Sequence, residues 1–170
     1  MMKVFGLAGW SGSGKTSLII RLLPELNRLG FAVSTIKHAH HRFDVDKPGK
    51  DSWHHREAGA TEVLISSHNR WALMHENKDE GEACLGDLIA RLSPVDLVLV
   101  EGFKTEPHDK LEIHRTELGK PLLQPEDANI VAVATDASLG QLSVPCLDLN
   151  DTDAVIRFIL THCQLAEQAA

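Results

Sequence analysis

The apolar positions of the chain fall into short continuous runs and into longer stretches where they recur every three or four residues. Short runs bounded by turn residues are typical of buried strands, and the second pattern is typical of amphipathic helices. Strands are predicted at residues 4–8, 31–36, 62–66, 71–74, 95–100, 111–114 and 130–134. Helices are predicted at residues 15–29, 51–58, 80–92 and 152–162, with Asp151 as the N-cap of the last one. This alternation indicates an α/β fold with a mostly parallel central sheet flanked by helices.

Two segments of this pattern predict added antiparallel strands. The strands at 62–66 and 71–74 are close enough to form a hairpin through His68 and Asn69, and the short piece at 111–114 is expected to run antiparallel as well. Within the first helix Pro24 should cause a kink, and Gly30 should end that helix. Because no repeat or linker divides the chain, residues 1–170 are expected to form a single nucleotide-binding domain.

The turn between the first strand and the first helix matches G-x-x-x-x-G-K-[ST] at every fixed position. Its glycines allow successive N–H groups to surround a phosphate, and the helix N-terminus adds partial positive charge. Lys15 is expected to act on the β- and γ-phosphates, and the Thr16 hydroxyl fits a Mg²⁺ position. The pattern therefore predicts a P-loop NTPase fold. The residues assigned to the nucleotide are Gly9, Trp10, Ser11, Gly12, Ser13, Gly14, Lys15, Thr16 and Ser17.

A carboxylate that ends the apolar run 95–100 is the first candidate for the acidic partner of the metal. Glu101 follows that predicted buried strand, as in a Walker-B element, and is expected to hold Mg²⁺ through water and to take part in hydrolysis. Gly102 would allow the backbone to approach the γ-phosphate. Walker-B elements usually carry Asp, and an acid at a strand end that hydrogen-bonds a loop explains the same pattern.

A second source of acids is the polar segment 43–52, which follows the second strand. Asp46 and Asp51 are the candidate metal ligands in it, because Mg²⁺ prefers carboxylate oxygens. Asp44 is a weaker candidate, and the alternative role of Asp51 is to cap the helix at 51–58.

Half of the ten histidines lie between residues 38 and 55. If the second strand ran through residue 40, His38 and His40 would face the same way and could chelate Zn²⁺ or Ni²⁺. The spacing matches no closed zinc pattern, so polar loop histidines without a metal are the simpler interpretation.

Asp136, at the end of the strand 130–134, is the best candidate to recognise the base of the nucleotide. One carboxylate there could accept both N1–H and N2–H₂ of guanine, a pairing that adenine does not offer, so GTP is the expected nucleotide. A turn-forming Asp at a strand end is the equal alternative. The guanine signature N-K-x-D is absent, since Asn77-Lys78-Asp79-Glu80 departs from it and precedes the strand that it should follow.

Charge and composition exclude several protein classes. The net charge is −7, yet residues 1–60 hold nine Lys and Arg against five Asp and Glu. This local excess fits an anion site and not the broad basic face of a nucleic-acid-binding protein. The three cysteines show no pairing pattern, and no apolar stretch is long enough for a bilayer. A cytoplasmic protein with no membrane segment is expected.

Several longer blocks make the chain resemble the molybdopterin-guanine dinucleotide biosynthesis protein B (MobB) family. They are the segments 9–16, 36–41, 44–52, 56–60, 70–74, 99–104 and 133–136. The resemblance implies a homodimeric GTP-binding protein with weak GTPase activity. Such a protein assists the guanylyltransferase that converts the molybdopterin cofactor to its guanine dinucleotide form.

Two other functions compete with this one. A P-loop metabolite kinase would need lid arginines, for which Arg56 and Arg70 are the candidates, although no arginine-rich lid is visible. A metal-delivery GTPase would use the histidines at 38–41.

Overall fold

The computed structural model of the protein describes residues 1–39, 43–78 and 81–166, which form two compact units. Residues 1–38 and 89–170 make the first unit, and residues 39–88 make the second. Each unit is described here by itself.

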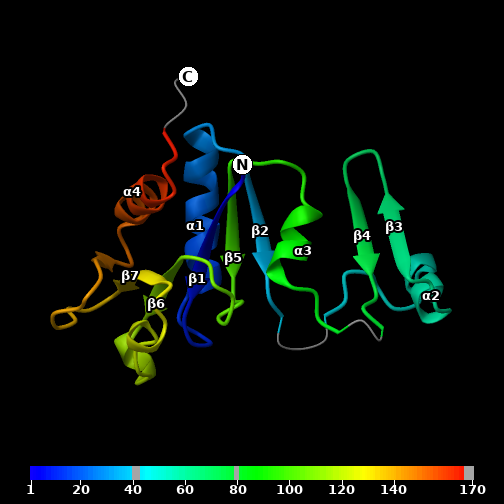
Figure 1. Cartoon of the computed structure of the whole chain (residues 1–170). Coiled ribbons are helices and arrows are strands. Elements are labelled where there is room, and N and C mark those ends of the chain that lie inside the picture. The colour runs from blue at the N-terminus through cyan, green and yellow to red at the C-terminus, as the bar shows by residue number, and fades with distance from the viewer. Residues whose placement is uncertain (40–42, 79–80, 167–170) are drawn as a thin grey trace. The chain divides into compact units, whose positions relative to one another are not determined.

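The first unit is built on a six-stranded sheet in which every neighbouring pair is parallel (Figure 1). Its order is β2-β5-β1-β6-β7-β8. The strands are β1 (Lys3–Ala8), β2 (Val33–Lys37), β5 (Leu97–Glu101), β6 (Lys110–His114), β7 (Ile130–Thr135) and β8 (Cys146–Asp148). The predicted α/β fold with a mostly parallel sheet is therefore confirmed.

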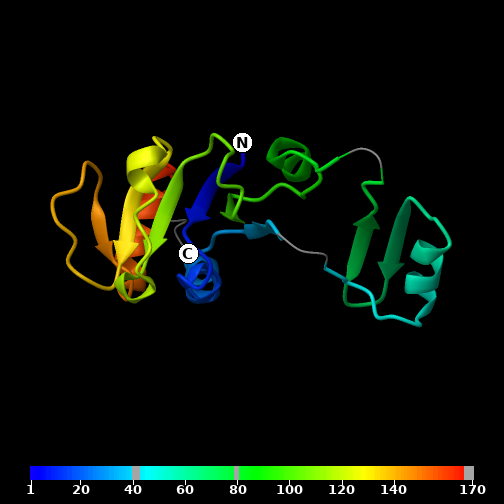
Figure 2. The same ribbon diagram turned by 90° about the horizontal axis from the view of Figure 1, so that it is seen from below.

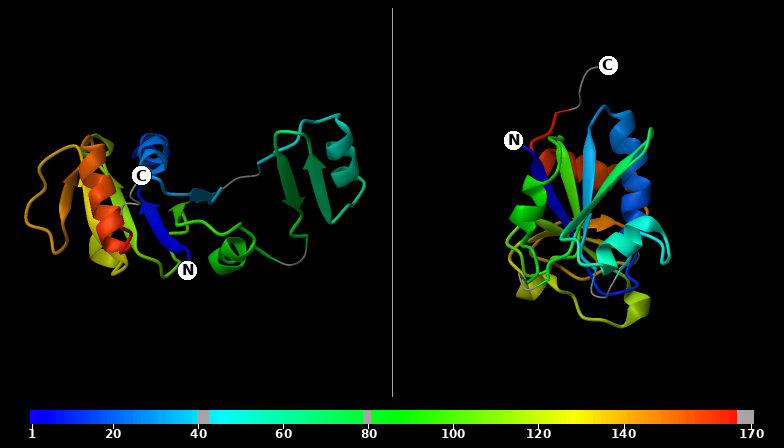
Figure 3. Two further views of the ribbon diagram at one scale, coloured as in Figure 1. Left: turned by 90° about the horizontal axis from the view of Figure 1, so that it is seen from above. Right: turned by 90° about the vertical axis from the view of Figure 1, so that its right-hand side faces the viewer.

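Two helices pack together against one face of this sheet. They are α1 (Lys15–Arg28) and α4 (Thr152–His162), which contact each other and lie side by side in the left view of Figure 3. Alternate strand residues such as Phe5, Leu99 and Ile113 are 0–1% exposed and form one core with both helices. As predicted, Asp151 caps α4, since its Oδ1 accepts a hydrogen bond from Ala154 N at 2.8 Å.

The prediction that the segment 111–114 adds an antiparallel strand is wrong, because β6 is parallel to both β1 and β7. Short connections usually join antiparallel neighbours. Here the connection 102–109 crosses β1, since Gly102 N donates to Leu7 O and Asp109 O accepts from Gly6 N, and β6 then pairs beyond β1 instead of beside β5. Strand β8 was not predicted, since its three residues give too short an apolar pattern.

The second unit contains α2 (Asp51–Glu57) and a hairpin of β3 (Glu62–Ser66) and β4 (Trp71–His75). The hairpin is confirmed, but it forms a two-stranded sheet of its own and does not extend the central sheet. Figure 2 shows α2 beside β3, the strand that it contacts. Leu64, Trp71 and Leu73 of this hairpin are 43–65% exposed.

Helix α3 (Leu85–Ala90) is shorter than the predicted helix 80–92. Gly81 has a positive φ of 78°, a conformation that a right-handed helix does not use. No helix in the described part of the chain has both the length and the apolar character needed to cross a bilayer.

Candidate nucleotide-binding site

The turn from β1 into α1 has the predicted strand–loop–helix form, with α1 starting at Lys15. Glycine is required at two of its positions. A Cβ on Gly9 would lie 2.5 Å from the Ile113 carbonyl oxygen, and Gly14 has a φ of 99° as the residue before the helix. The Oγ of Ser13 is buried and has no hydrogen-bond partner in the structure. An unpartnered buried hydroxyl in a glycine-rich loop before a helix N-terminus fits a phosphate oxygen.

The Lys15 side chain is folded over this loop. Its Nζ donates to the carbonyl oxygens of Gly9 and Trp10, each at 2.9 Å. Burial lowers the pKa of Lys15, nearby Glu101 opposes that lowering, and Lys104 and Lys37 add to it. Several cations therefore converge near this loop, which favours an anionic ligand.

Thr16, Glu101 and Lys37 meet beside the start of α1. Thr16 Oγ1 donates to Glu101 Oε1 at 2.8 Å. The Lys37 ammonium lies 3.2 Å from the same carboxylate oxygen and 3.3 Å from the Thr16 hydroxyl. Strand register explains this arrangement, because Lys37 and Glu101 are direct partners in the parallel pair β2–β5.

The two oxygens of this group fit a magnesium ion. A threonine hydroxyl and a carboxylate are hard oxygen donors of the type that Mg²⁺ prefers. The Glu101 side chain is 12% exposed, whereas that of Lys37 is 59% exposed and can move away. Gly102 has a φ of 95°, and a Cβ there would lie 2.8 Å from His38 Cβ, so a side chain at this position would be strained. The structure thus brings together two of the four predicted metal ligands, Thr16 and Glu101.

Arg115 was missed by the sequence reasoning. Its Nε donates to the Ser13 carbonyl oxygen at 3.2 Å, and its Nη1 lies 3.0 Å from Asp136 Oδ2. The second Asp136 oxygen accepts from Thr116 N at 3.4 Å. Pairing of His114 with Thr135 in β6–β7 places the two following residues, Arg115 and Asp136, side by side. Asp136 is therefore linked to the phosphate loop through one guanidinium, and its contact with a base stays a prediction.

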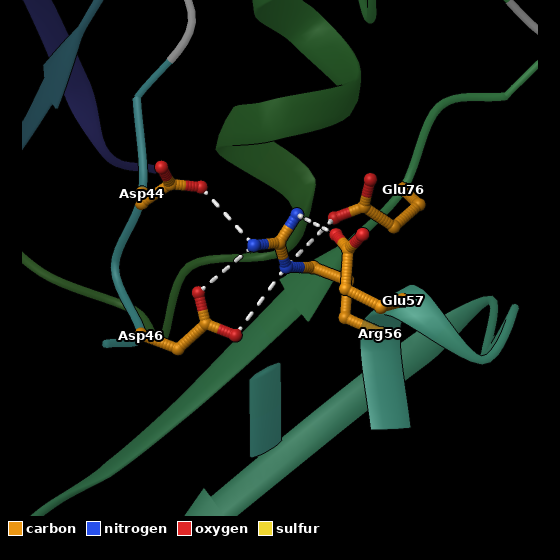
Figure 4. Close-up of polar contacts among 5 residues, drawn as sticks. All are labelled: Asp44, Asp46, Arg56, Glu57 and Glu76. Carbon is orange, nitrogen blue, oxygen red and sulfur yellow. Dashed lines mark hydrogen bonds and ion pairs between the residues drawn. The ribbon is translucent and has the colours of Figure 1, made fainter. Parts of the chain in front are cut away.

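The acidic segment 43–52 lies in the second unit, where Arg56 gathers four carboxylates (Figure 4). Its nitrogens lie 3.2–3.3 Å from both oxygens of Asp46, 3.1 Å from Asp44, 3.6 Å from Glu57 and 3.8 Å from Glu76. The hydrogen bond that Arg56 donates to the Asp46 carboxylate is the main cause that raises the pKa of Arg56. Asp46 is almost fully buried, with a side chain 1% exposed.

These contacts bear on three sequence predictions. Asp46 is held by Arg56 within the second unit, and its contact with a metal stays a prediction, as does that of Asp51. The alternative role of Asp51 as a helix cap is wrong, because Lys50 is the N-cap residue and Asp51 is the first residue of α2. Arg56, a candidate lid arginine of a kinase, is occupied by acidic neighbours.

The histidine segment is only partly described. Strand β2 ends at Lys37, and the His38 ring packs on Phe103 with 4.7 Å between ring centroids. His40 and His41 lie outside the described residues. Within residues 1–39, 43–78 and 81–166, no group of three or more His, Cys, Asp or Glu side chains is arranged to hold a metal.

Similarity to known proteins identifies the family. Residues 4–136 match the family model described as molybdopterin guanine dinucleotide synthesis protein B, MobB. The chain is 43% identical to the molybdopterin-guanine dinucleotide biosynthesis adapter protein of Escherichia coli (strain K12), with 96% of this chain and 95% of that protein covered. It is 45% identical to the Haemophilus influenzae protein of the same name, over 92% and 86% of the two chains.

Solved structures agree with this result. A MobB homologue from Bacillus stearothermophilus has a TM-score of 0.72 and 26% identity, covering 97% of this chain and all of that one. A crystal structure of molybdopterin-guanine biosynthesis protein B has a TM-score of 0.74 and 27% identity, covering 95% and 99%. The chain therefore belongs to the MobB family, the adapter proteins of molybdopterin guanine dinucleotide biosynthesis.

Proposed function

We propose that this protein binds GTP with Mg²⁺, hydrolyses it weakly, and assists the guanylyltransferase that forms molybdopterin guanine dinucleotide. The observation that carries the proposal is the meeting of Thr16 and Glu101 at 2.8 Å beside a complete phosphate loop. The family of the chain supports the pathway, and the residues of this site support the ligand.

In the proposed site of the first unit, different residues bind the phosphates, the metal and the base. The N–H groups of residues 9–16 and the Lys15 ammonium bind the β- and γ-phosphates. Thr16 and Glu101 hold Mg²⁺, which when bound neutralises charge on those phosphates. With Mg²⁺ bound there, the exposed Lys37 side chain would be free to leave Glu101 and to contact a phosphate oxygen. Asp136 accepts the guanine N1–H and N2–H₂, and Arg115 holds its carboxylate in position.

The family supports the proposed partners. The adapter proteins of E. coli and H. influenzae are named for the biosynthesis of molybdopterin-guanine dinucleotide. This chain accordingly acts in the cytoplasm beside the guanylyltransferase, and the molybdopterin cofactor is a candidate second ligand.

A homodimer formed through the hairpin completes the proposal. One face of β3–β4 exposes Leu64, Leu73 and Trp71. Leu64 pairs directly with Leu73 across the two strands, and Trp71 lies two residues before Leu73 in β4. Among the described residues β3 pairs with β4 alone, so each strand keeps a free edge. Exposed apolar side chains beside free strand edges favour pairing with another chain.

Calorimetric titration of GTP with Mg²⁺ into wild type and Lys15→Ala tests this function. Loss of the ammonium from the phosphates should weaken GTP binding by about a hundredfold, the cost of one or two charge-assisted contacts. Lys50→Ala is the matched control, since it removes an exposed lysine of the second unit and should leave the affinity unchanged. An unchanged affinity in a folded Lys15→Ala protein would overturn the assignment of the phosphate loop.

A further inference from the structure

The indole of Trp10 is an unusual feature of this phosphate loop, because two lysines lie over its ring. Lys104 Nζ is 5.1 Å and Lys120 Nζ is 5.6 Å from the ring centroid. The indole Nε1 donates to the Pro121 carbonyl oxygen at 2.8 Å, which fixes the plane of the ring. Trp10 is half-buried and both lysines are exposed, so ligands in solvent can reach all three side chains.

Neither lysine is paired with an acid among the residues that the structure describes. Within the described part of the chain, no carboxylate lies in ion-pair distance of Lys104 or Lys120. Two other lysines of the first unit do pair with acids, Lys37 with Glu101 and Lys110 with Asp127. A cation–π contact orients an ammonium group without removing its charge. Lys104 and Lys120 thus present two positive charges beside an aromatic surface.

These charges exceed what the proposed nucleotide site uses. The phosphates are assigned to Lys15 and the loop N–H groups, and the base to Asp136, which contacts Arg115 and Thr116. The indole of Trp10 contacts a different set of residues, Lys104, Lys120 and Pro121, whereas the Trp10 carbonyl oxygen accepts from Lys15. An aromatic ring flanked by unpaired cations is suited to a flat ring that carries an anion, since the ring can stack and the anion can accept hydrogen bonds.

We propose that Trp10, Lys104 and Lys120 form a second ligand site, beside the phosphate loop, for a planar heteroaromatic ring bearing a phosphate monoester. On binding, the exposed lysine side chains move off the face of the indole and the ring stacks there. The phosphate, with a charge of about −1.5 to −2, accepts hydrogen bonds from both ammonium groups. The identity of the ring rests on the proposed function, because a pterin phosphate is the component to which the guanylyl group is joined. The adapter would then hold both components of the dinucleotide on one unit.

The probe is a pterin that carries a phosphate monoester on a methylene group at position 6. The comparison compound is the same pterin with a free hydroxymethyl group at that position. Each is titrated calorimetrically into the full chain saturated with a non-hydrolysable GTP analogue and Mg²⁺. We expect the phosphorylated pterin to bind at least about tenfold more tightly, the effect of one charge-assisted contact. Lys104→Ala/Lys120→Ala should weaken it by at least about tenfold, and Lys120→Ala alone should leave affinity for the GTP analogue within about twofold.

Three results would overturn the proposal. They are equal affinity for the two pterins, unchanged binding in the double variant, and loss of pterin phosphate binding when the GTP analogue saturates the protein. The last would mean that the phosphate loop itself holds the probe. Lys47→Ala/Lys50→Ala is the control, because it removes the same charge from the second unit. A parallel titration with inorganic phosphate must give weaker binding than the pterin phosphate; equal binding would reject the stacking role of Trp10.

The test separates this site from the proposed function. Titration of the pterin phosphate into Lys15→Ala without nucleotide measures the second site alone. If wild type fails to bind GTP while Lys15→Ala binds the pterin phosphate, the proposed GTP function fails and the second site stands. The reverse pattern rejects the second site only.

Discussion

In the first unit the Glu101 carboxylate contacts a hydroxyl and a flexible ammonium, whereas in the second unit Asp46 contacts a guanidinium with both of its oxygens. Lys37 is more than half exposed and can be displaced, but Arg56 is held by four acids at once. A carboxylate with a mobile partner is available to a metal ion. One that is buried and paired by a bidentate arginine stabilises its own loop instead.

The two units also differ in how completely their strands are buried. Every residue of β5 is buried, so that this strand fixes Glu101 rigidly beside α1. In β3, by contrast, only Val63 is buried, and the hairpin exposes a row of apolar side chains. A rigid, fully packed sheet suits a site with strict geometry, and an open apolar face suits a partner surface.

The largest expected effect concerns this packing. Leu99→Ala deletes a fully buried side chain of β5 and should lower the free energy of unfolding by about 2–5 kcal/mol. Leu73→Ala, in the hairpin, is the matched substitution at a 43% exposed position and should cost less than about 1 kcal/mol. Urea denaturation of both variants measures the difference. Equal costs would show that Leu73 is covered in solution.

The second largest effect is expected for the proposed metal ligand Glu101. Glu101→Gln keeps the shape and removes the charge, so Mg²⁺-dependent GTP hydrolysis should fall by about a hundredfold with a modest change in GTP affinity. Asp46→Asn is the matched change in the second unit. An equal fall in the rate would support the predicted metal contact of Asp46, and a rate within about twofold would show that Asp46 serves to hold Arg56. Single-turnover rates decide between them. Hydrolysis at the wild-type rate in Glu101→Gln would mean that an acid of the segment 44–51 holds the metal.

A smaller effect is expected for the base. Asp136→Ala should reduce the preference for GTP over ATP by about 1–3 kcal/mol, the cost of leaving a buried polar group unpaired. Glu117→Ala removes an exposed acid of the same unit and should leave the preference unchanged. Competition of labelled GTP against ATP measures both. A preference that survives in Asp136→Ala would show that Asp136 serves only to hold Arg115.

The smallest effect concerns the hairpin surface. Leu64→Ser/Leu73→Ser should weaken a homodimer by about tenfold, because two partly exposed apolar side chains each contribute little. Val45→Ser, at another exposed apolar position of the second unit, is the control and should not change the dimer. Sedimentation equilibrium gives the dissociation constants. A monomeric wild type would reject this interface.

The phosphate loop and its flanks could be predicted from the sequence because their signals are local. The spacing of Gly9, Gly14, Lys15 and Thr16, an apolar strand before them and a helical period after them all lie within about thirty consecutive residues, where local sequence decides the structure. The strand that ends in Glu101 was visible for the same reason, as was the hairpin.

The contacts that make the site could not be predicted, because they depend on which strands become neighbours. Arg115 reaches Ser13 and Asp136 only because β6 is parallel to β7; the antiparallel strand that the sequence predicted would have placed Arg115 at the opposite edge of the sheet. Nothing local to residues 102–109 reveals that this short connection crosses beyond β1.

The sequence by itself thus determined the residue types: a complete phosphate loop, a strand that delivers one acid, and a segment rich in further acids and histidines. Only the tertiary structure decided their partners. Strand register places Lys37 against Glu101. Folding also pairs Asp46 with Arg56 and brings Lys104 and Lys120 over the Trp10 ring. The physical reason is that electrostatic and hydrogen-bond energies depend on distances of a few ångströms between residues far apart in the chain, and packing alone sets those distances.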